Sequence, residues 1–85
     1  MAAQLEFKEL QELAGEILGV DADQVLMDKS FQRDLAADSL DLVELIAAIE
    51  DKYEVELSEE QLEKMKVIGD LWKFLEQKTA ERLEA

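Results

Sequence analysis

The 85-residue sequence contains no cysteine and no histidine, and the two absences exclude several classes of function. Without cysteine there is no disulfide framework, no thiolate metal site and no cysteine nucleophile. Without histidine the usual general base near neutral pH is missing, so no serine of the chain can belong to a serine–histidine–acid triad. The carboxylates are abundant, but no pair of them stands out for acid–base work. The composition therefore offers no candidate catalytic residue and argues against a hydrolase, and we expect that the protein is not an enzyme.

Basic residues are scarce, and long apolar runs are missing. The chain has 9 Lys and Arg against 22 Asp and Glu, which gives a net charge of −13. Such a surface repels nucleic acid and anionic membranes and attracts basic protein partners. No run approaches the ~18 apolar residues of a membrane span, and the segment MAAQLEFKEL lacks the basic and apolar blocks of a secretory signal. We expect a monomeric, cytoplasmic protein that binds neither nucleic acid nor membranes.

Apolar residues make up 48% of the chain, and no proline interrupts their helical spacing. This spacing predicts a first helix over residues 3–18 and a second over 39–53. A short third helix over 59–65 and a last helix over 68–82 follow. We therefore predict an all-α fold in a single domain over residues 1–85, a small bundle of three long helices and one short one.

Residues at the predicted helix ends agree with these boundaries. Gly19 stands just past the first helix, where a left-handed C-terminal cap favours glycine. Asp38 is a good N-cap for the second helix, and Asp41 lies in its first turn, where the helix dipole favours anions. The segment SEEQ, residues 58–61, matches a capping box that opens the third helix.

A long connection, residues 20–37, separates the first two helices. A loop of this length in a compact domain carries function or is fixed by its apolar side chains, here Val25, Leu26, Phe31 and Leu35. Polar residues that can cap short turns within it are Asp28, Ser30 and Asp34. The segment DADQVLMDKSFQ begins like a calcium loop but lacks the required glycine and glutamate, so we predict no metal site.

The second helix has two apolar sides on a helical wheel. One is the predicted core stripe of Leu42, Leu45, Ile46, Ile49 and Tyr53. With it the core would contain Leu10, Leu13, Ile17, Ile68, Leu71, Trp72 and Leu75. The other side carries Leu40, Val43 and Ala47 among the acids Glu44, Glu50 and Asp51. That side is either a solvated face with a few apolar residues or a docking strip for basic partners.

Ser39 lies at the start of the second helix, at the edge of this strip. Asp38 already supplies the cap, and Ser39 follows a long loop, so its hydroxyl is expected to be exposed. A passive, exposed hydroxyl suits a residue that another enzyme modifies, and the N-terminus of a helix favours an attached phosphate. The alternative is that Ser39 is only a first-turn residue of the helix.

The segment LAADSLDLVELIAAIEDKYEVEL, residues 35–57, resembles the acyl carrier proteins of fatty-acid and polyketide synthesis. Their signature, Leu-Gly-Ala-Asp-Ser-Leu-Asp, precedes an acidic helix, and the likeness continues in ILGVDADQV, SFQRDL and IGDLWKFLE. The resemblance implies a carrier whose Ser39 receives 4′-phosphopantetheine from coenzyme A through a magnesium-dependent phosphopantetheinyl transferase. The terminal thiol of that arm would hold acyl groups as thioesters and deliver them to acyl-transferring and chain-elongating enzymes.

The same resemblance implies a partner-recognition strip of Asp38, Leu40, Asp41, Glu44, Ala47, Glu50 and Asp51, to which the wheel adds Val43. The chain departs from the family pattern at several positions. Ala36 stands where glycine is usual, and alanine is costly there if that position needs a positive φ. Leu42 replaces a small polar residue, and Val67 replaces a capping threonine. A peptidyl or aminoacyl carrier, or an unmodified acidic helical adaptor, are the alternative functions.

Overall fold

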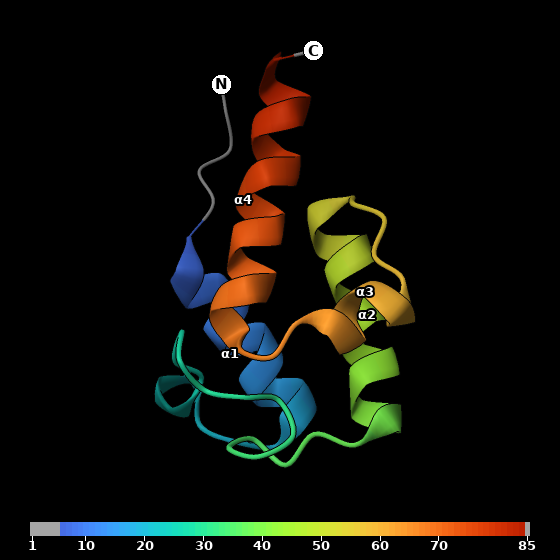
Figure 1. Cartoon of the computed structure of the whole chain (residues 1–85). Helices are drawn as coiled ribbons and strands as arrows, with labels where there is room; N and C mark the ends of the chain where they lie inside the picture. The colour runs from blue at the N-terminus through green and yellow to red at the C-terminus, as the bar shows by residue number, and fades with distance from the viewer. Residues whose placement is uncertain (1–5, 85) are drawn as a thin grey trace.

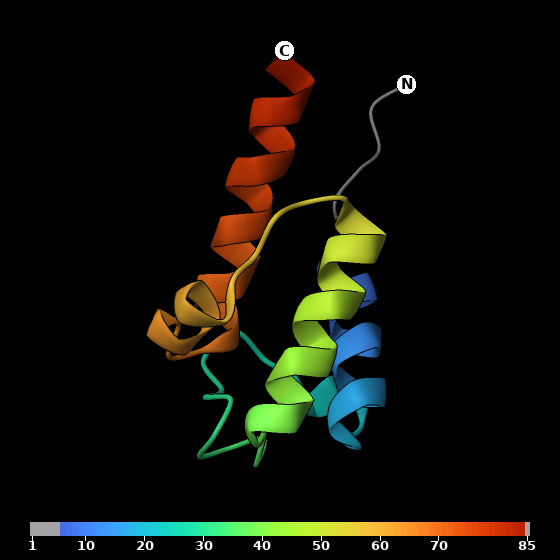
Figure 2. The ribbon, with the colours of Figure 1, turned by 90° about the vertical axis from the view of Figure 1, so that its right-hand side faces the viewer.

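The computed structural model describes residues 6–84, and within them the fold is all-helical, as predicted. Its elements are α1 (Phe7–Leu18), the 3₁₀ helix η1 (Ala22–Gln24), α2 (Ser39–Tyr53), α3 (Glu59–Lys64) and α4 (Ile68–Glu84). In Figures 1 and 2, α2 stands beside α1, and Figure 2 shows the short α3 next to the start of α4. The prediction of a small helical bundle is confirmed.

The first helix begins later than predicted. Glu6 has extended dihedral angles (φ −112°, ψ 127°) and precedes the helix, so α1 begins at Phe7, while residues 3–5 lie outside the described residues. Glu6 is therefore the N-cap residue, which is itself non-helical, and its side chain makes no capping hydrogen bond. At the other end Gly19 adopts the predicted left-handed conformation (φ 72°), and its N–H donates to the carbonyl of Gly15.

The boundaries of the last two helices differ from prediction by one or two residues. The capping box of Ser58 and Gln61 is present as predicted and opens α3. That helix ends at Lys64, because Met65 turns into an extended conformation (φ −84°, ψ 120°). The last helix runs to Glu84, two residues beyond the predicted end, since no glycine or proline stops it there.

The core combines one face of each long helix with side chains from the loops. The predicted core residues that are buried are Leu10, Leu45, Ile46, Ile49, Ile68, Leu71 and Leu75. Four others pack against this core but are only partly buried, because they lie at its edges: Leu13, Ile17, Tyr53 and Trp72. Several further residues, which were not predicted to belong to the core, are also buried, namely Ala14, Val25, Phe31, Leu35, Ala37, Val55, Leu57 and Leu62. Leu42 is buried in the predicted stripe of α2.

Buried apolar side chains fix the loop between α1 and α2. Val25, Phe31 and Leu35 are buried, whereas Leu26 is 43% exposed and does not hold the loop. Ser30 organises a turn within the loop, as predicted, because its Oγ accepts hydrogen bonds from the N–H groups that follow it. The carboxylate of Asp34 in turn accepts from the backbone N–H of Ser30 at 2.8 Å.

Backbone hydrogen bonds tie this loop to the start of α4. Ile68 N donates to the carbonyl of Lys29 at 2.9 Å, and Gly69 N donates to the carbonyl of Met27 at 2.8 Å. A threonine cap is absent at Val67, but the carboxylate of Asp70 accepts from the N–H groups that precede the helix. The loop therefore closes against α4, although the two are far apart in the sequence.

Ala36 has a left-handed backbone conformation, with φ 53°. This confirms that the position at which the family usually has glycine needs a positive φ. The conformation costs a non-glycine residue roughly 1–2 kcal/mol. It allows Ala37 N to donate to the carbonyl of Phe31 at 2.8 Å, which turns the chain toward α2.

Replacing Ala36 with glycine is expected to stabilise the protein. The left-handed strain disappears, and the added freedom of the unfolded chain cancels only part of the gain, leaving about 0.5–1 kcal/mol. Thermal unfolding followed by circular dichroism should show a melting temperature about 3–6 °C higher. The matched control is Ala47→Gly, which should cost about 1 kcal/mol because Ala47 lies inside a helix. A lower melting temperature for Ala36→Gly would contradict the assigned strain.

Candidate functional site

A reciprocal pair of hydrogen bonds fixes the start of α2. Asp38 Oδ1 accepts from Asp41 N at 2.9 Å, and Asp41 Oδ2 accepts from Asp38 N at 3.3 Å. The sequence predicted Asp38 as the cap but not the return bond, because the usual box pairs serine or threonine with glutamate or glutamine. With both bonds in place, the first helical residue is Ser39.

Ser39 is exposed, and its side chain makes no hydrogen bond among residues 6–80. It therefore does not act as the cap, which is the role of Asp38. The N–H groups of Ser39 and Leu40 belong to the first turn, where no carbonyl of the helix can accept from them. Together with the positive end of the helix dipole they favour an anion at this position. The site thus fits a phosphate ester on the Ser39 oxygen.

The outer face of α2 continues from this serine. Leu40 and Val43 are the most exposed large apolar side chains of the helix, at 65% and 45%. At 100° per residue, they lie with Glu44, Ala47 and Asp51 on the side opposite the buried stripe. All five are exposed. The structure therefore brings together the predicted apolar patch and two of the three carboxylates that the wheel placed on this side, Glu44 and Asp51.

Two acids of the predicted strip have structural contacts as well. Asp41 is partly buried and engaged in the capping box. Glu50 is partly buried, and its Oε2 accepts from the backbone N–H of Leu57 at 3.1 Å, which ties α2 to the loop before α3. No motif signals this last contact, because it joins two residues across a loop.

The far end of α2 is anchored to α1. Lys52 Nζ lies 3.3 Å from Glu9 Oε2, and this ion pair joins the two helices. Burial, with a smaller contribution from the nearby Glu9 carboxylate, raises the pKa of Tyr53 to about 12. Tyr53 therefore stays neutral at physiological pH and adds no charge to the acidic helix.

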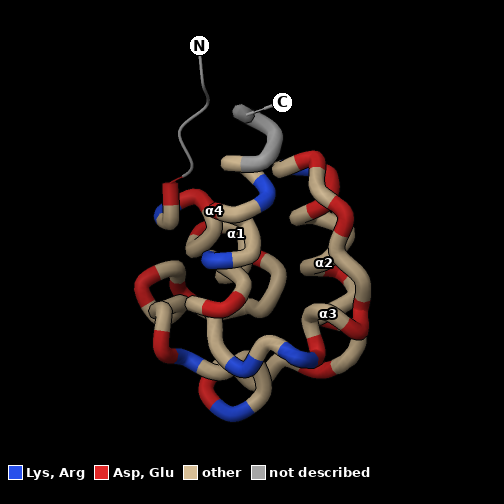
Figure 3. The backbone as a smooth tube through the Cα atoms, turned by 45° about the horizontal axis from the view of Figure 1, so that its top comes forward, with Lys and Arg blue, Asp and Glu red and all other residues tan. Residues whose placement is uncertain are grey.

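In Figure 3 acidic positions recur along α2.

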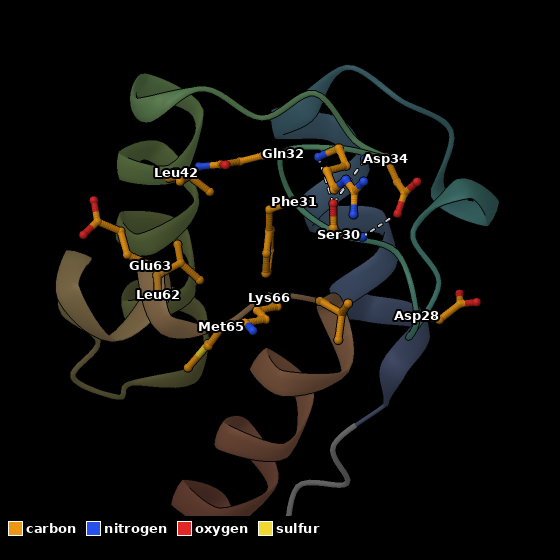
Figure 4. A pocket seen from close by; sticks show the side chains of 12 residues that line it. Asp28, Ser30, Phe31, Gln32, Asp34, Leu42, Leu62, Glu63, Met65 and Lys66 are labelled. Carbon is orange, nitrogen blue, oxygen red and sulfur yellow. Dashed lines mark hydrogen bonds between the residues drawn. The ribbon is translucent and has the colours of Figure 1, made fainter.

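A cleft opens beside α2, between this helix, α3 and the loop that precedes α2 (Figure 4). Its volume is about 770 Å³. Its walls include Phe31 from the loop, Leu42 from α2, and Leu62 and Met65 from α3 and its end. Leu42 follows Ser39 by three residues, a rise of about 4.5 Å along the helix. The sequence did not predict this cleft, because loop and α3 residues distant in the chain build it.

The described part of the chain gives no sign of two other kinds of site. None of the helices within residues 6–84 is long and apolar enough to cross a membrane. In the same part of the chain, no group of three or more histidine, cysteine, aspartate or glutamate side chains is arranged to hold a metal ion.

Comparison with known proteins gives a consistent result. Residues 8–75 match the family described as the phosphopantetheine attachment site. The acyl carrier protein of Helicobacter pylori (strain G27) is 49% identical over 70 residues, which cover 82% of this chain and 90% of that protein. The one of Helicobacter acinonychis (strain Sheeba) is 47% identical over the same shares. The one of Clostridium acetobutylicum (strain ATCC 824) is 39% identical over 75 residues, covering 88% and 97%.

Carriers of this kind are not enzymes; their covalently attached 4′-phosphopantetheine supplies a thiol that holds acyl groups as thioesters. The all-helical fold and the exposed serine at a capped helix start agree with that role. The chain belongs to the acyl carrier protein family.

Proposed function

We propose that Ser39 is the residue that carries the phosphopantetheine arm. The proposal rests on the start of α2. There the carboxylates of Asp38 and Asp41 each accept a hydrogen bond from the backbone N–H of the other residue, and the Ser39 side chain is left exposed. The other two serines have structural contacts. Ser30 Oγ accepts from Arg33 N, and the Ser58 hydroxyl accepts from a backbone N–H of α3.

The proposed attachment needs no base on this chain. Ser39 Oγ forms a bond to the phosphorus atom that carries the pantetheine of coenzyme A. The phosphoanhydride bond breaks, the adenosine 3′,5′-bisphosphate leaves with the bonding electron pair, and a base of the transferase takes the hydroxyl proton. The role of this chain is to present the oxygen and to hold the resulting phosphodiester anion beside the positive end of α2.

We also propose that the outer face of α2 is the surface that partner enzymes recognise. Its exposed centre is Leu40, Val43 and Ala47, flanked by Glu44 and Asp51. A basic patch on a phosphopantetheinyl transferase, or on a synthesis enzyme of the fatty-acid or polyketide type, fits such a surface. The further acids of the predicted strip, Asp38, Asp41 and Glu50, would contribute charge while keeping their structural contacts. On this account the carrier is a cytoplasmic monomer.

Substitution of Ser39 tests the attachment site. After incubation with coenzyme A, magnesium and a broad-specificity phosphopantetheinyl transferase, the unmodified wild-type chain should gain the mass of one phosphopantetheinyl group. Ser39→Ala should gain none, because no other serine has a free hydroxyl at a helix start. Ser30→Ala and Ser58→Ala are the controls and should still be modified. Modification of Ser39→Ala would contradict the assignment.

Charge reversal at Glu44 tests the recognition surface. Glu44→Lys changes an exposed carboxylate opposite the core stripe, so the helical content should not change. The rate of modification by the transferase should fall, and the loss should be larger at low salt, where the charges are less screened. Glu76→Lys, an equal reversal on the exposed side of α4, is the control and should leave the rate close to wild type. Equal rates for the two variants at low ionic strength would mean that partners bind another face.

A further inference from the structure

The protein has a second exposed apolar surface, away from α2. Among the described residues, the exposed large apolar side chains are Leu40 and Val43 on α2, and Leu26 and Met27 on the loop after η1. In Figure 1 the turquoise segment after η1 lies at the left of the molecule, whereas α2 stands at its right. The recognition surface proposed on α2 therefore does not account for the exposure of Leu26 and Met27.

Met27 borders a groove of about 550 Å³ between this loop and the start of α4. The other apolar residues that line it are Val67, Gly69 and Trp72. Met27 lies close to α4 because Gly69 has no side chain, and a Cβ there would come within 3.1 Å of the Met27 carbonyl oxygen. Trp72 is partly buried, and its ring packs edge-to-face on Phe7 with the ring centroids 5.2 Å apart. The groove thus combines a fixed aromatic ring with an adaptable methionine, two side chains that are enriched at protein interfaces.

The side of α4 that borders the groove extends over about two turns. Four lining residues lie within about 100° of one another on the helix, along a rise of about 10 Å, namely Gly69, Trp72, Lys73 and Glu76. None of them belongs to the buried stripe of α4, and Lys73 and Glu76 are exposed. The groove is therefore long enough for a segment of a partner to lie along α4.

The backbone at the edge of the groove is already hydrogen-bonded. The carbonyl of Met27 accepts from Gly69 N at 2.8 Å, and the carbonyl of Lys29 accepts from Ile68 N at 2.9 Å. An extended peptide would therefore compete with α4 for these carbonyls if it were to bind as an added strand. A helix satisfies its own backbone and can bind through side chains alone, so a helical partner fits this groove better.

Acids outnumber bases around the groove. Its charged residues are the carboxylates of Asp28, Asp70 and Glu76 and the ammonium of Lys73. In Figure 4 the Asp28 carboxylate points away from the cleft beside α2. Asp70 also accepts from the backbone N–H groups that precede α4, which fixes its carboxylate without removing the charge. A basic partner is therefore complementary to the groove, whereas a second copy of this chain, with its net charge of −13, is repelled.

We propose that the groove between the loop after η1 and the start of α4 is a second docking surface, which binds a basic amphipathic helix of a partner protein. The apolar side of that helix lies against Met27 and Trp72, and its lysines or arginines reach Asp28 and Glu76 at the rim. The groove shares no residue with the outer face of α2. A partner bound here leaves Ser39 accessible, so one protein can hold the carrier while an enzyme uses the face proposed on α2.

The tryptophan reports directly on this groove, because Trp72 is the only one in the chain. The probe is a synthetic amphipathic peptide of leucine and lysine, about four helical turns long, titrated into the full chain at low salt. The emission of Trp72 should shift to shorter wavelength and saturate, because the peptide covers the ring. A peptide of the same pattern with serine in place of lysine is the control and should bind about tenfold more weakly.

Variants distinguish the groove from the rest of the acidic surface. Met27→Gln removes apolar area from the groove and should weaken binding roughly fivefold. Leu40→Gln makes the matching change on α2 and should leave the Trp72 titration as it is. Lys73→Glu removes a repelling charge and should tighten binding about threefold at low salt. Lys64→Glu, an equal change on α3 outside the groove, should have a smaller effect.

Four results would overturn the inference. The first is an emission that does not respond to the peptide. The second is a shift that depends on protein concentration without peptide, which would mean that a second copy covers the groove. The third is equal affinity for the lysine and serine peptides, which would show that charge does not select the occupant. The fourth is binding that Leu40→Gln weakens and Met27→Gln does not, which would place the peptide on α2.

Discussion

The start of α2 is the constraint on which the site depends. The mutual hydrogen bonds of Asp38 and Asp41 decide which residue is the first of the helix. The buried stripe that begins with Leu42 decides how the helix is rotated. With both the first residue and the rotation fixed, Ser39 is exposed at the start of α2, and Leu40 and Val43 face solvent. If the helix packed on the core with its register shifted by one residue, these side chains would rotate by about 100° relative to the core.

The loop before α2 shows how a small domain maintains that geometry. It has few residues in regular structure, yet Val25, Phe31 and Leu35 bury their side chains under the helices. Its backbone is also bonded to the start of α4, and Ala36 accepts a strained φ of 53° so that the chain can turn into α2. The strain is tolerable because the surrounding contacts determine the turn. The same loop supplies one wall of the cleft beside α2, so its packing also shapes that cleft.

Most of the fold could be predicted from the sequence because its signals are local. The helical spacing of the apolar residues predicted where the helices lie. Gly19 indicated the end of α1, and Asp38 and the Ser58–Gln61 capping box indicated the starts of α2 and α3. The buried loop residues were harder to assign, because Val25 and Phe31 have no period and their burial depends on distant helices. The contact between Glu50 and the N–H of Leu57, and the cleft itself, were missed for the same reason. The exposed strip was found because a helical wheel needs no tertiary information.

The most direct test of the account is the mass of the protein purified from its own host, followed by fragmentation to locate any modification. The account predicts a mass one phosphopantetheinyl group above that of the sequence, with or without an acyl group. It also predicts that the added mass maps to Ser39 in the segment AADSLDLVEL. A chain that carries the group on Ser30 or Ser58, or carries none, would contradict the central claim.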